Sequence, residues 1–171
     1  MKTRILFAAG VALLALAACS RRDETTNRTG VTTGAAGLQV NSVGAAGDCM
    51  SPSDMNRPAE DFTPEQRVQL VSCINAAAAR QVNAQLPRQM DEVTRLDRLT
   101  TEGPLLIYNA TILRPASSLS PGTVQQVAER TRTMVCAQPQ MRETIRLGGA
   151  YGYRWVDNQG VLINEIRIDA C

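Results

Sequence analysis

The sequence contains no histidine, and its single lysine is Lys2. A serine nucleophile needs a positioned base, which in the usual hydrolase arrangements is a histidine or a lysine. Three serines gather at Ser117, Ser118 and Ser120, but apart from the N-terminal lysine no such base exists for them. These absences exclude ordinary serine hydrolase chemistry and favour a protein that is not an enzyme.

Aromatic residues make up 4% of the chain, and no two cysteines have C-x-x-C spacing. Without that spacing and without histidine, neither a zinc site nor thioredoxin-like redox chemistry is expected. The basic residues form no block, so nucleic-acid binding has little electrostatic support. We therefore predict no cofactor, no metal and no nucleic-acid partner.

The first feature that the sequence does contain is a leader. Lys2 and Arg4 precede an apolar run from Ile5 to Ala18, about 14 residues long. A transmembrane helix needs roughly 20 apolar residues, so residues 1–18 are predicted to be a secretion signal. Its removal takes away two basic residues and leaves 16 basic against 16 acidic ones, so the mature chain is formally neutral.

The leader ends in Leu16-Ala17-Ala18-Cys19, which resembles the bacterial lipobox. The resemblance implies that the Cys19 thiol receives a diacylglyceryl group, that the chain is cut between Ala18 and Cys19, and that the new amine is acylated. Two or more acyl chains make anchoring to a membrane stable. The following residue is Ser20 rather than aspartate, which by the same resemblance implies the periplasmic side of the outer membrane. The alternative is an ordinary leader followed by a chance cysteine.

The composition then divides the mature chain in two. The segment from Ser20 to about Gly47 is rich in Thr, Gly, Asn, Ala and Ser and shows no apolar periodicity. Such a segment behaves as a flexible chain. We therefore predict a lipidated tether at residues 19–57 and one globular domain at residues 58–171.

Within the domain, apolar spacing and turn signals predict three helices and two hairpins. Thr63-Pro64-Glu65-Gln66 forms a capping box, and the helix after Pro121 carries Val124, Val127, Thr131 and Met134 at helical spacing. The expected elements are a helix to about Gln85, strands at 92–100 and 105–113, helices from Pro121 and Pro139, and a hairpin of 151–156 and 161–169 turning at Asp157-Asn158-Gln159-Gly160. This order, α-β-β-α-α-β-β, predicts a two-layer α+β fold: a four-stranded antiparallel sheet with helices on one face.

Four cysteines remain after the leader is removed: Cys49, Cys73, Cys136 and Cys171. An even number in an exported chain predicts two disulfides, for which three pairings exist. Cys136 ends a predicted helix and Cys171 follows the last strand, so we favour a bond between them, with Cys49 bonded to Cys73. The other two pairings remain open.

The stretch from Leu86 to Asp97 has the pattern L-P-x-x-x-D-E-x-T-x-L-D, and Gly103 and Tyr108 follow it. This pattern resembles a family of uncharacterised exported proteins of Gram-negative bacteria. The resemblance covers residues 64–171 and implies no known activity. A looser, architectural resemblance is to the pilotin lipoproteins of type II secretion, which escort secretin subunits. It implies a protein partner in the envelope.

The domain's carboxylates are most concentrated at Asp91, Glu92 and Asp97. They are candidates for binding a cation or for acid and base chemistry. We favour a structural role, because adjacent residues of a strand point to opposite faces and several arginines lie close in sequence. Three further arginines are candidates for binding an anion: Arg142, Arg146 and Arg154.

Tyr151, Tyr153 and Trp155 alternate along the predicted C-terminal hairpin. Tyr and Trp are frequent anchors of protein interfaces, so the three residues form a possible binding face. The alternative, which we favour, is that they are the buried face of the hairpin.

Two functions are compatible with these features. The first is a membrane-anchored, non-enzymatic lipoprotein that binds another component of the envelope, with a pilotin-like role as one version. The alternative is a periplasmic inhibitor or immunity protein that blocks a lytic enzyme with the predicted loop at residues 115–122.

Overall fold

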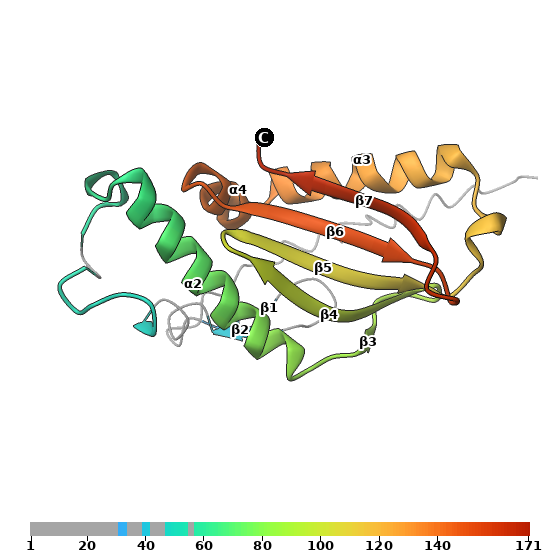
Figure 1. The fold of residues 1–171 in the computed structure, drawn as a ribbon, viewed down its shortest axis with the longest axis horizontal. Helices are drawn as coiled ribbons and strands as arrows, with labels where there is room; N and C mark the ends of the chain where they lie inside the picture. The colour runs from blue at the N-terminus through green and yellow to red at the C-terminus, as the bar shows by residue number, and fades with distance from the viewer. Residues whose placement is uncertain (1–30, 34–38, 42–46, 55–56) are drawn as a thin grey trace, which may run out of the picture.

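The computed structural model describes residues 31–33, 39–41, 47–54 and 57–171 (Figure 1). The predicted leader, the cleavage site between Ala18 and Cys19, and most of the predicted tether lie outside this part of the chain, so lipidation stays a prediction. Two short strands, β1 (Val31–Thr33) and β2 (Gln39–Asn41), pair antiparallel, and β2 lies beside helix α2. In the described part, no helix is long and apolar enough to cross a bilayer.

The main sheet has five strands in the order β3-β4-β5-β6-β7 (Figure 1). The strands are β3 (Arg88–Gln89), β4 (Thr94–Glu102), β5 (Leu105–Ile112), β6 (Ala150–Val156) and β7 (Leu162–Ile168). β5 and β6 are parallel, and the other neighbouring pairs are antiparallel. The prediction of a four-stranded antiparallel sheet is therefore wrong, both in the number of strands and in one pairing.

The parallel pair follows from the helical connection between the two hairpins. Helix α3 (Pro121–Ala137) has 17 residues, about 25 Å at 1.5 Å per residue, so it returns the chain along the sheet toward the end where β5 began. After α4 (Pro139–Arg146), β6 starts with Ala150 in register with Leu105. Two adjacent strands that start at the same end of a sheet are parallel.

The fifth strand, β3, is an edge strand of two residues. Arg88 pairs with Leu96 and Gln89 with Arg95. A segment this short has no alternation of apolar and polar residues, which is the signal that identifies strands in a sequence. Nothing in the sequence therefore predicts this strand.

The three α-helices begin at the predicted residues; side chains cap the first turns of α2 and α3, whereas α4 begins with a proline and has no side-chain cap. In α2 (Pro64–Asn83), the Thr63 hydroxyl accepts a hydrogen bond from the Gln66 N–H at 3.2 Å, and the Gln66 side chain accepts one from the Thr63 N–H at 2.9 Å. Ser120 caps α3 by accepting from the Thr123 N–H at 3.1 Å. Each helix has proline near its first residue, where the missing N–H costs nothing.

One hydrophobic core lies between the three helices and a single face of the sheet. The register places Leu106 beside Tyr151 and Ala110 beside Trp155 on that face. The core also contains buried residues of α2, α3, β4 and β7: Ala79, Val82, Val135, Leu96, Leu99 and Ile168. Half-buried side chains of α4 pack against the same cluster. The sheet and the three helices therefore form one packed unit.

Side chains of the helices bind backbone groups at both edges of this sheet. The Asn83 amide of α2 accepts from the Leu99 N–H at 2.7 Å and donates to the Leu99 carbonyl at 2.9 Å, at the edge of β4 that β3 leaves uncovered. At the opposite edge, Arg132 of α3 donates to the Arg167 carbonyl at 3.4 Å. These bonds satisfy backbone groups at the sheet edges that could otherwise pair with a strand of another chain. They also fix which side of each helix faces outward.

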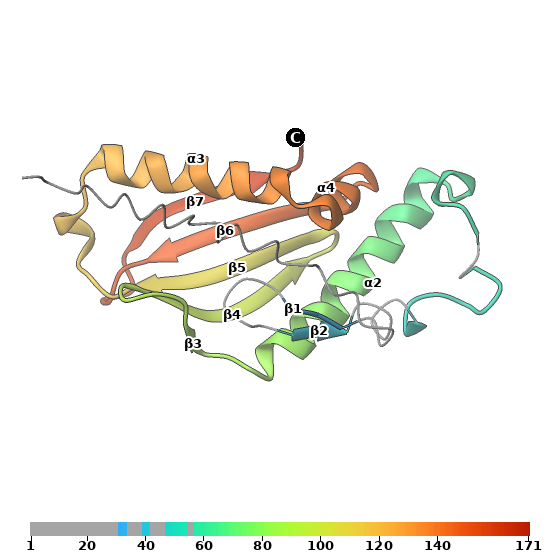
Figure 2. The same cartoon turned by 180° about the vertical axis from the view of Figure 1, so that it is seen from behind.

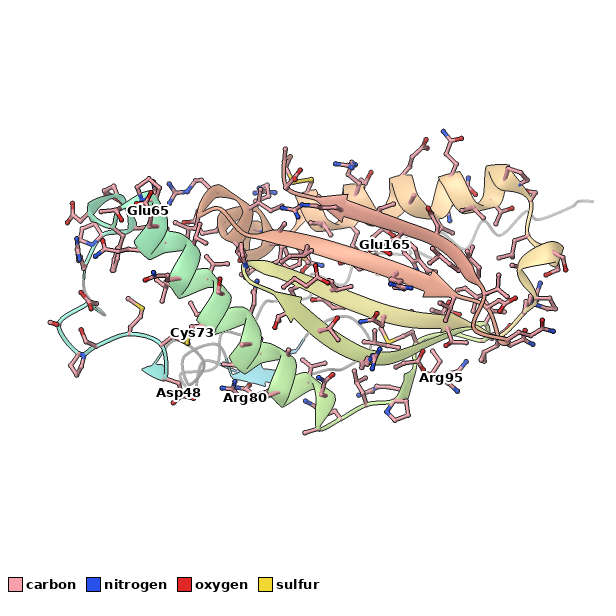
Figure 3. The ribbon with its side chains drawn as sticks, viewed as in Figure 1. Asp48, Glu65, Cys73, Arg80, Arg95 and Glu165 are labelled. Carbon is pink, nitrogen blue, oxygen red and sulfur yellow. A yellow bond between two sulfur atoms is a disulfide. The ribbon has the colours of Figure 1, made fainter. Side chains whose placement is uncertain are left out.

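The structure contains two disulfides, Cys49–Cys73 and Cys136–Cys171, which is the pairing that the sequence favoured. Cys73 lies on the exposed side of α2 (Figure 3). The second bond joins Cys136 in the last turn of α3 to Cys171, three residues after the end of β7. It therefore ties the helical layer to the edge of the sheet.

Candidate functional site

The predicted aromatic face divides between the core and the surface of the domain. Tyr151 and Trp155 are 6% and 8% exposed and belong to the core, as the favoured interpretation had it. Tyr153 lies between them on β6 and is only half-buried. Its ring stacks on Trp155 with centroids 5.8 Å apart and on Tyr108 of β5 at 4.9 Å. Tyr108 therefore belongs to the same stack of aromatic rings as Tyr153 and Trp155, although it is far from them in the sequence.

Around these two tyrosines, the core face of the sheet is less well covered than elsewhere. The register aligns Tyr108, Tyr153 and Ile166 across β5, β6 and β7. With Met90 and Ile112 they are half-buried apolar side chains packed against the core. We call these five residues the aromatic strip.

Helix α3 forms one side of the strip. Its inward line consists of residues four, three and four apart: Val124, Ala128, Thr131 and Val135. Because helix residues succeed each other at about 100°, Arg132 lies roughly 70° to one side of that line, and Val127 and Met134 lie roughly 70–90° to the other. Arg132 reaches the outer edge of β7, so the opposite flank is turned toward the middle of the sheet.

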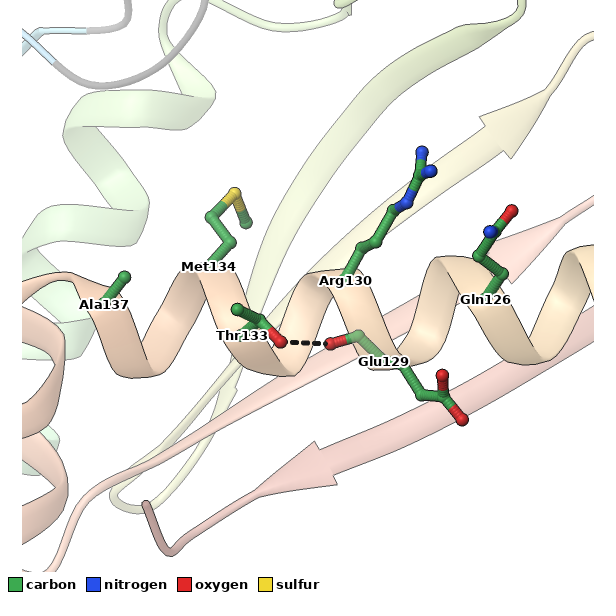
Figure 4. A pocket seen from close by; sticks show the side chains of 6 residues that line it. All are labelled: Gln126, Glu129, Arg130, Thr133, Met134 and Ala137. Atoms are coloured by element: carbon green, nitrogen blue, oxygen red, sulfur yellow. Dashed lines mark hydrogen bonds between the residues drawn. The ribbon is translucent and has the colours of Figure 1, made fainter.

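Val127 and Met134 are 42% and 43% exposed. With Arg130, which lies further round the helix at about 130° from the inward line, they form what we call the inner flank of α3. Figure 4 shows the Met134 and Arg130 side chains on one side of the helix and the Glu129 carboxylate on the other. A hollow of about 480 Å³ lies on the side of α3 that faces away from the sheet, and it is lined by Gln126, Glu129, Arg130, Thr133, Met134 and Ala137. Helix α3 lies in front of the sheet in Figure 2, so this hollow is not the space above the aromatic strip and shares only Arg130 and Met134 with the inner flank. The aromatic strip and the inner flank together form the candidate binding surface.

The strip is electrically neutral. Burial raises the pKa of the Tyr108 phenol and of the Tyr153 phenol above their usual value, so both keep their protons at neutral pH. Within the described part of the chain, neither hydroxyl makes a hydrogen bond with another residue.

Asp91 and Asp97 have structural roles, as favoured from the sequence, whereas Glu92 is exposed on the surface. Asp91 accepts from the N–H groups of Val93 and Thr94, both at 2.8 Å, and so caps the turn before β4. Asp97 accepts from Arg95 at 2.5 Å and from the Thr111 hydroxyl at 2.6 Å. Among the described residues, no group of three potential metal ligands comes together.

The three candidate arginines do not converge on one anion site. Arg146 pairs with Glu143 at 2.6 Å, one turn away on α4. Arg142 donates to the Cys136 carbonyl at 2.7 Å. Arg154 lies on the face of the sheet opposite the core, 3.7 Å from Glu165.

Asp157 connects the β6–β7 turn to the loop before α3. The sequence predicts it only as part of a turn. Asp157 is 4% exposed. It accepts from the N–H groups of Gln159 and Val161 in its own turn, both at 2.8 Å, and from the Ala116 N–H at 3.0 Å. The loop proposed as an inhibitory plug is therefore fastened at its start to the β6–β7 turn. Only the spacing Asp-x-x-Gly hinted at such a carboxylate.

Asp157→Ala is expected to lower the midpoint of thermal unfolding by several degrees, because it removes the acceptor of three backbone donors. The hydrogen bond from Ala116, followed by those in the turn, holds the pKa of Asp157 below its usual value. Its contribution to stability is therefore full above about pH 4, the pKa in the unfolded chain, and is lost as the pH falls through the lower folded pKa. Thermal melts between pH 7 and pH 3 test both effects. Asp169→Ala, which removes an exposed carboxylate paired with Arg167, is the control and should change little.

Comparison with known proteins finds similarity in structure only. No protein-family model matches the sequence, and no curated protein matches it. A protein of Pseudomonas aeruginosa described as secreted matches with a TM-score of 0.55 and 18% identity, over 61% of this chain and 93% of that one. The type 2 secretion pilotin of Vibrio vulnificus matches at 0.53 and 14%, over 61% and 92%. The type II secretion pilotin AspS of Vibrio cholerae matches at 0.51 and 16%, over 61% and 93%.

At identities this low, the matches show a shared fold and nothing about activity. They confirm the architectural resemblance to pilotins. The family suggested by the L-P-x-x-x-D-E-x-T-x-L-D pattern stays a prediction, because none of the matches rests on that motif.

Proposed function

We propose that this chain is a lipid-anchored accessory protein of the bacterial envelope, which binds a segment of another envelope protein in the manner of a pilotin and catalyses no reaction. The observation that carries the proposal is the fold shared with two pilotins. The lipobox ending at Cys19 supplies the anchor, and the two disulfides suit a compartment outside the cytosol.

The aromatic strip and the inner flank of α3 are the surface that we assign to this binding. Interfaces depend on a few large apolar or aromatic anchors. Here Tyr108 and Tyr153 are stacked and partly exposed on β5 and β6, and Met134 is 43% exposed on the flank of α3 turned toward the middle of the sheet. The two tyrosine rings are already stacked and packed against the core. Binding would therefore cost little further side-chain entropy at these residues. A bound segment would cover the remaining apolar area.

Met134→Asp is expected to reduce recovery of the envelope partner about tenfold or more, since it places a charge in an apolar contact. The full-length tagged chain is purified from detergent-solubilised membranes of its own cells, and the copurifying proteins are quantified. The matched control is Val161→Asp, at a side chain that is 51% exposed at the β6–β7 turn, which should leave recovery unchanged. Absence of a stoichiometric partner for the unaltered chain, or equal losses in both variants, would count decisively against the proposal.

The same purified domain can be assayed against cell-wall hydrolases. Inhibition would favour the alternative function as an inhibitor or immunity protein, whereas an accessory protein of the kind proposed should have no effect.

A further inference from the structure

One charged side chain, Arg130, lies on the inner flank of α3. It stands one turn before Met134, with its guanidinium on the same side of the helix (Figure 4). In the described part of the chain it makes no ion pair. The neighbouring Glu129 is turned to the other side of α3, where it accepts from the Gln125 amide at 2.9 Å. Arg130 therefore stands at the rim of the candidate surface without a counter-ion from its own helix.

Among the described residues of α2 on the opposite side of the surface, no side chain offers a negative charge to Arg130. Asn83 binds the outer edge of β4, so the side of α2 turned toward the strip is the one that carries Ala78, Gln81 and Gln85, roughly 140–200° around the helix from that asparagine. These side chains are uncharged. The strip between the helices is apolar and its two phenols stay protonated. The charged side chains at this surface are therefore Arg130 and, on β3, Arg88, which pairs with the core residue Leu96; both are positive.

We propose that the segment bound at this surface is apolar with an acidic residue, and that its carboxylate pairs with Arg130 while its apolar side chains cover Tyr108, Tyr153 and Met134. This inference rests on the proposed function and specifies the chemistry of the partner. A guanidinium offers parallel donors that match a carboxylate. A basic segment would place like charges together and be rejected, which makes Arg130 a determinant of specificity.

The test uses the full-length chain in its own membranes, with a photo-reactive amino acid replacing Met134. Ultraviolet light should join the chain to one envelope protein. In the same background, Arg130→Glu is expected to reduce the cross-linked product about tenfold and Arg130→Gln about threefold, because an ion pair at a partly covered rim contributes a modest share of binding. Arg130→Lys should keep most of the product, since the charge remains.

Two controls separate charge recognition from damage to the fold. Arg98→Glu makes the same charge change at an exposed residue of β4, on the face of the sheet opposite the core, and should leave the cross-link unchanged. Salt provides the second: moving from about 0.05 M to 0.5 M should weaken the cross-link of the unaltered chain and not that of Arg130→Gln, because screening acts on the ion pair. An undiminished cross-link in Arg130→Glu, or an equal loss in Arg98→Glu, overturns the inference while leaving the proposed function intact.

Failure of the proposed function gives a different result. In that case the photo-reactive residue yields no discrete product with another protein, or it joins the chain to itself or to a second copy. Either outcome shows that the surface is not a site for an envelope partner, and the inference about Arg130 falls with it.

Discussion

A chain with Cys19→Ser is expected to disappear from the outer-membrane fraction and to lose all incorporation of labelled fatty acid. The lipobox resemblance assigns the attachment of lipid to the thiol at position 19, for which a serine hydroxyl is no substitute. Each buried methylene of an acyl chain contributes about 0.8 kcal/mol to membrane binding, and a single chain gives only reversible attachment. Losing every chain should therefore change partitioning by several orders of magnitude, the largest effect expected of any single substitution here.

The measurement combines membrane fractionation with the intact mass of the purified product. Ser20→Ala is the matched control, because it alters the next residue and keeps the thiol, so its product should remain lipidated and membrane-bound. Recovery of the Cys19→Ser product in the outer membrane at the mass of the unaltered protein would contradict the assignment. Recovery with the leader cut at an unrelated site would point instead to an ordinary secreted protein.

The parts of the fold that could be predicted are those set by neighbouring residues. The capping box at Thr63 and Gln66 fixes the start of α2 through two hydrogen bonds three residues apart. The turn at residues 101–104 needs one residue with positive φ, and Gly103 supplies it at +57°. Such features depend on local contacts alone, so the sequence specifies them without knowledge of the tertiary structure.

The pairing of the two hairpins could not be predicted in the same way. Alternating residues define the two faces of a strand but not which edge of it meets a distant strand. The parallel contact between β5 and β6 arises only when α3 and α4 return the chain along the sheet. For this reason Tyr108 and Tyr153, 45 residues apart, were not recognised as a stacked pair.

Helix α3 shows how exposed apolar residues can be mistaken for part of the core. The predicted apolar line contained Val127 and Met134, which are in fact exposed, whereas the inward line runs through Ala128 and Val135. The sequence holds two adjacent apolar lines, more than a helix at the edge of a two-layer domain can bury. The extra line was visible in the sequence, and only packing against β7 decides which line faces inward.

The two disulfides are expected to differ sharply in their contribution to stability. A loop-entropy estimate assigns each about 3–4 kcal/mol, since the cysteines are 24 and 35 residues apart. That estimate assumes that both ends of the bond belong to the structure that unfolds as a unit. Cys136 ends α3 and Cys171 follows β7, whose Ile168 is 0% exposed, so the assumption holds for the second bond.

It does not hold for Cys49–Cys73. Residues 47–54 and 57–62 contribute no buried side chain, so they can separate from α2 while the core stays folded, and the bond then joins the domain to a loose segment. Replacing Cys136 and Cys171 by serine should lower the free energy of unfolding by about 3–4 kcal/mol and the melting midpoint by roughly 10–15 °C. Replacing Cys49 and Cys73 should cost less than about 1 kcal/mol, since the entropy term then acts on a segment outside the cooperative unit.

Urea titration of residues 47–171 in the two double-serine variants measures both free energies, and hydrogen exchange shows where protection is lost. Loss confined to residues 47–62 is expected for the first bond, and loss across β6, β7 and α3 for the second. The order of the two effects is the informative result. If removing Cys49–Cys73 destabilises the domain as much as removing Cys136–Cys171, the segment before α2 belongs to the cooperative unit and supports the helix next to the aromatic strip.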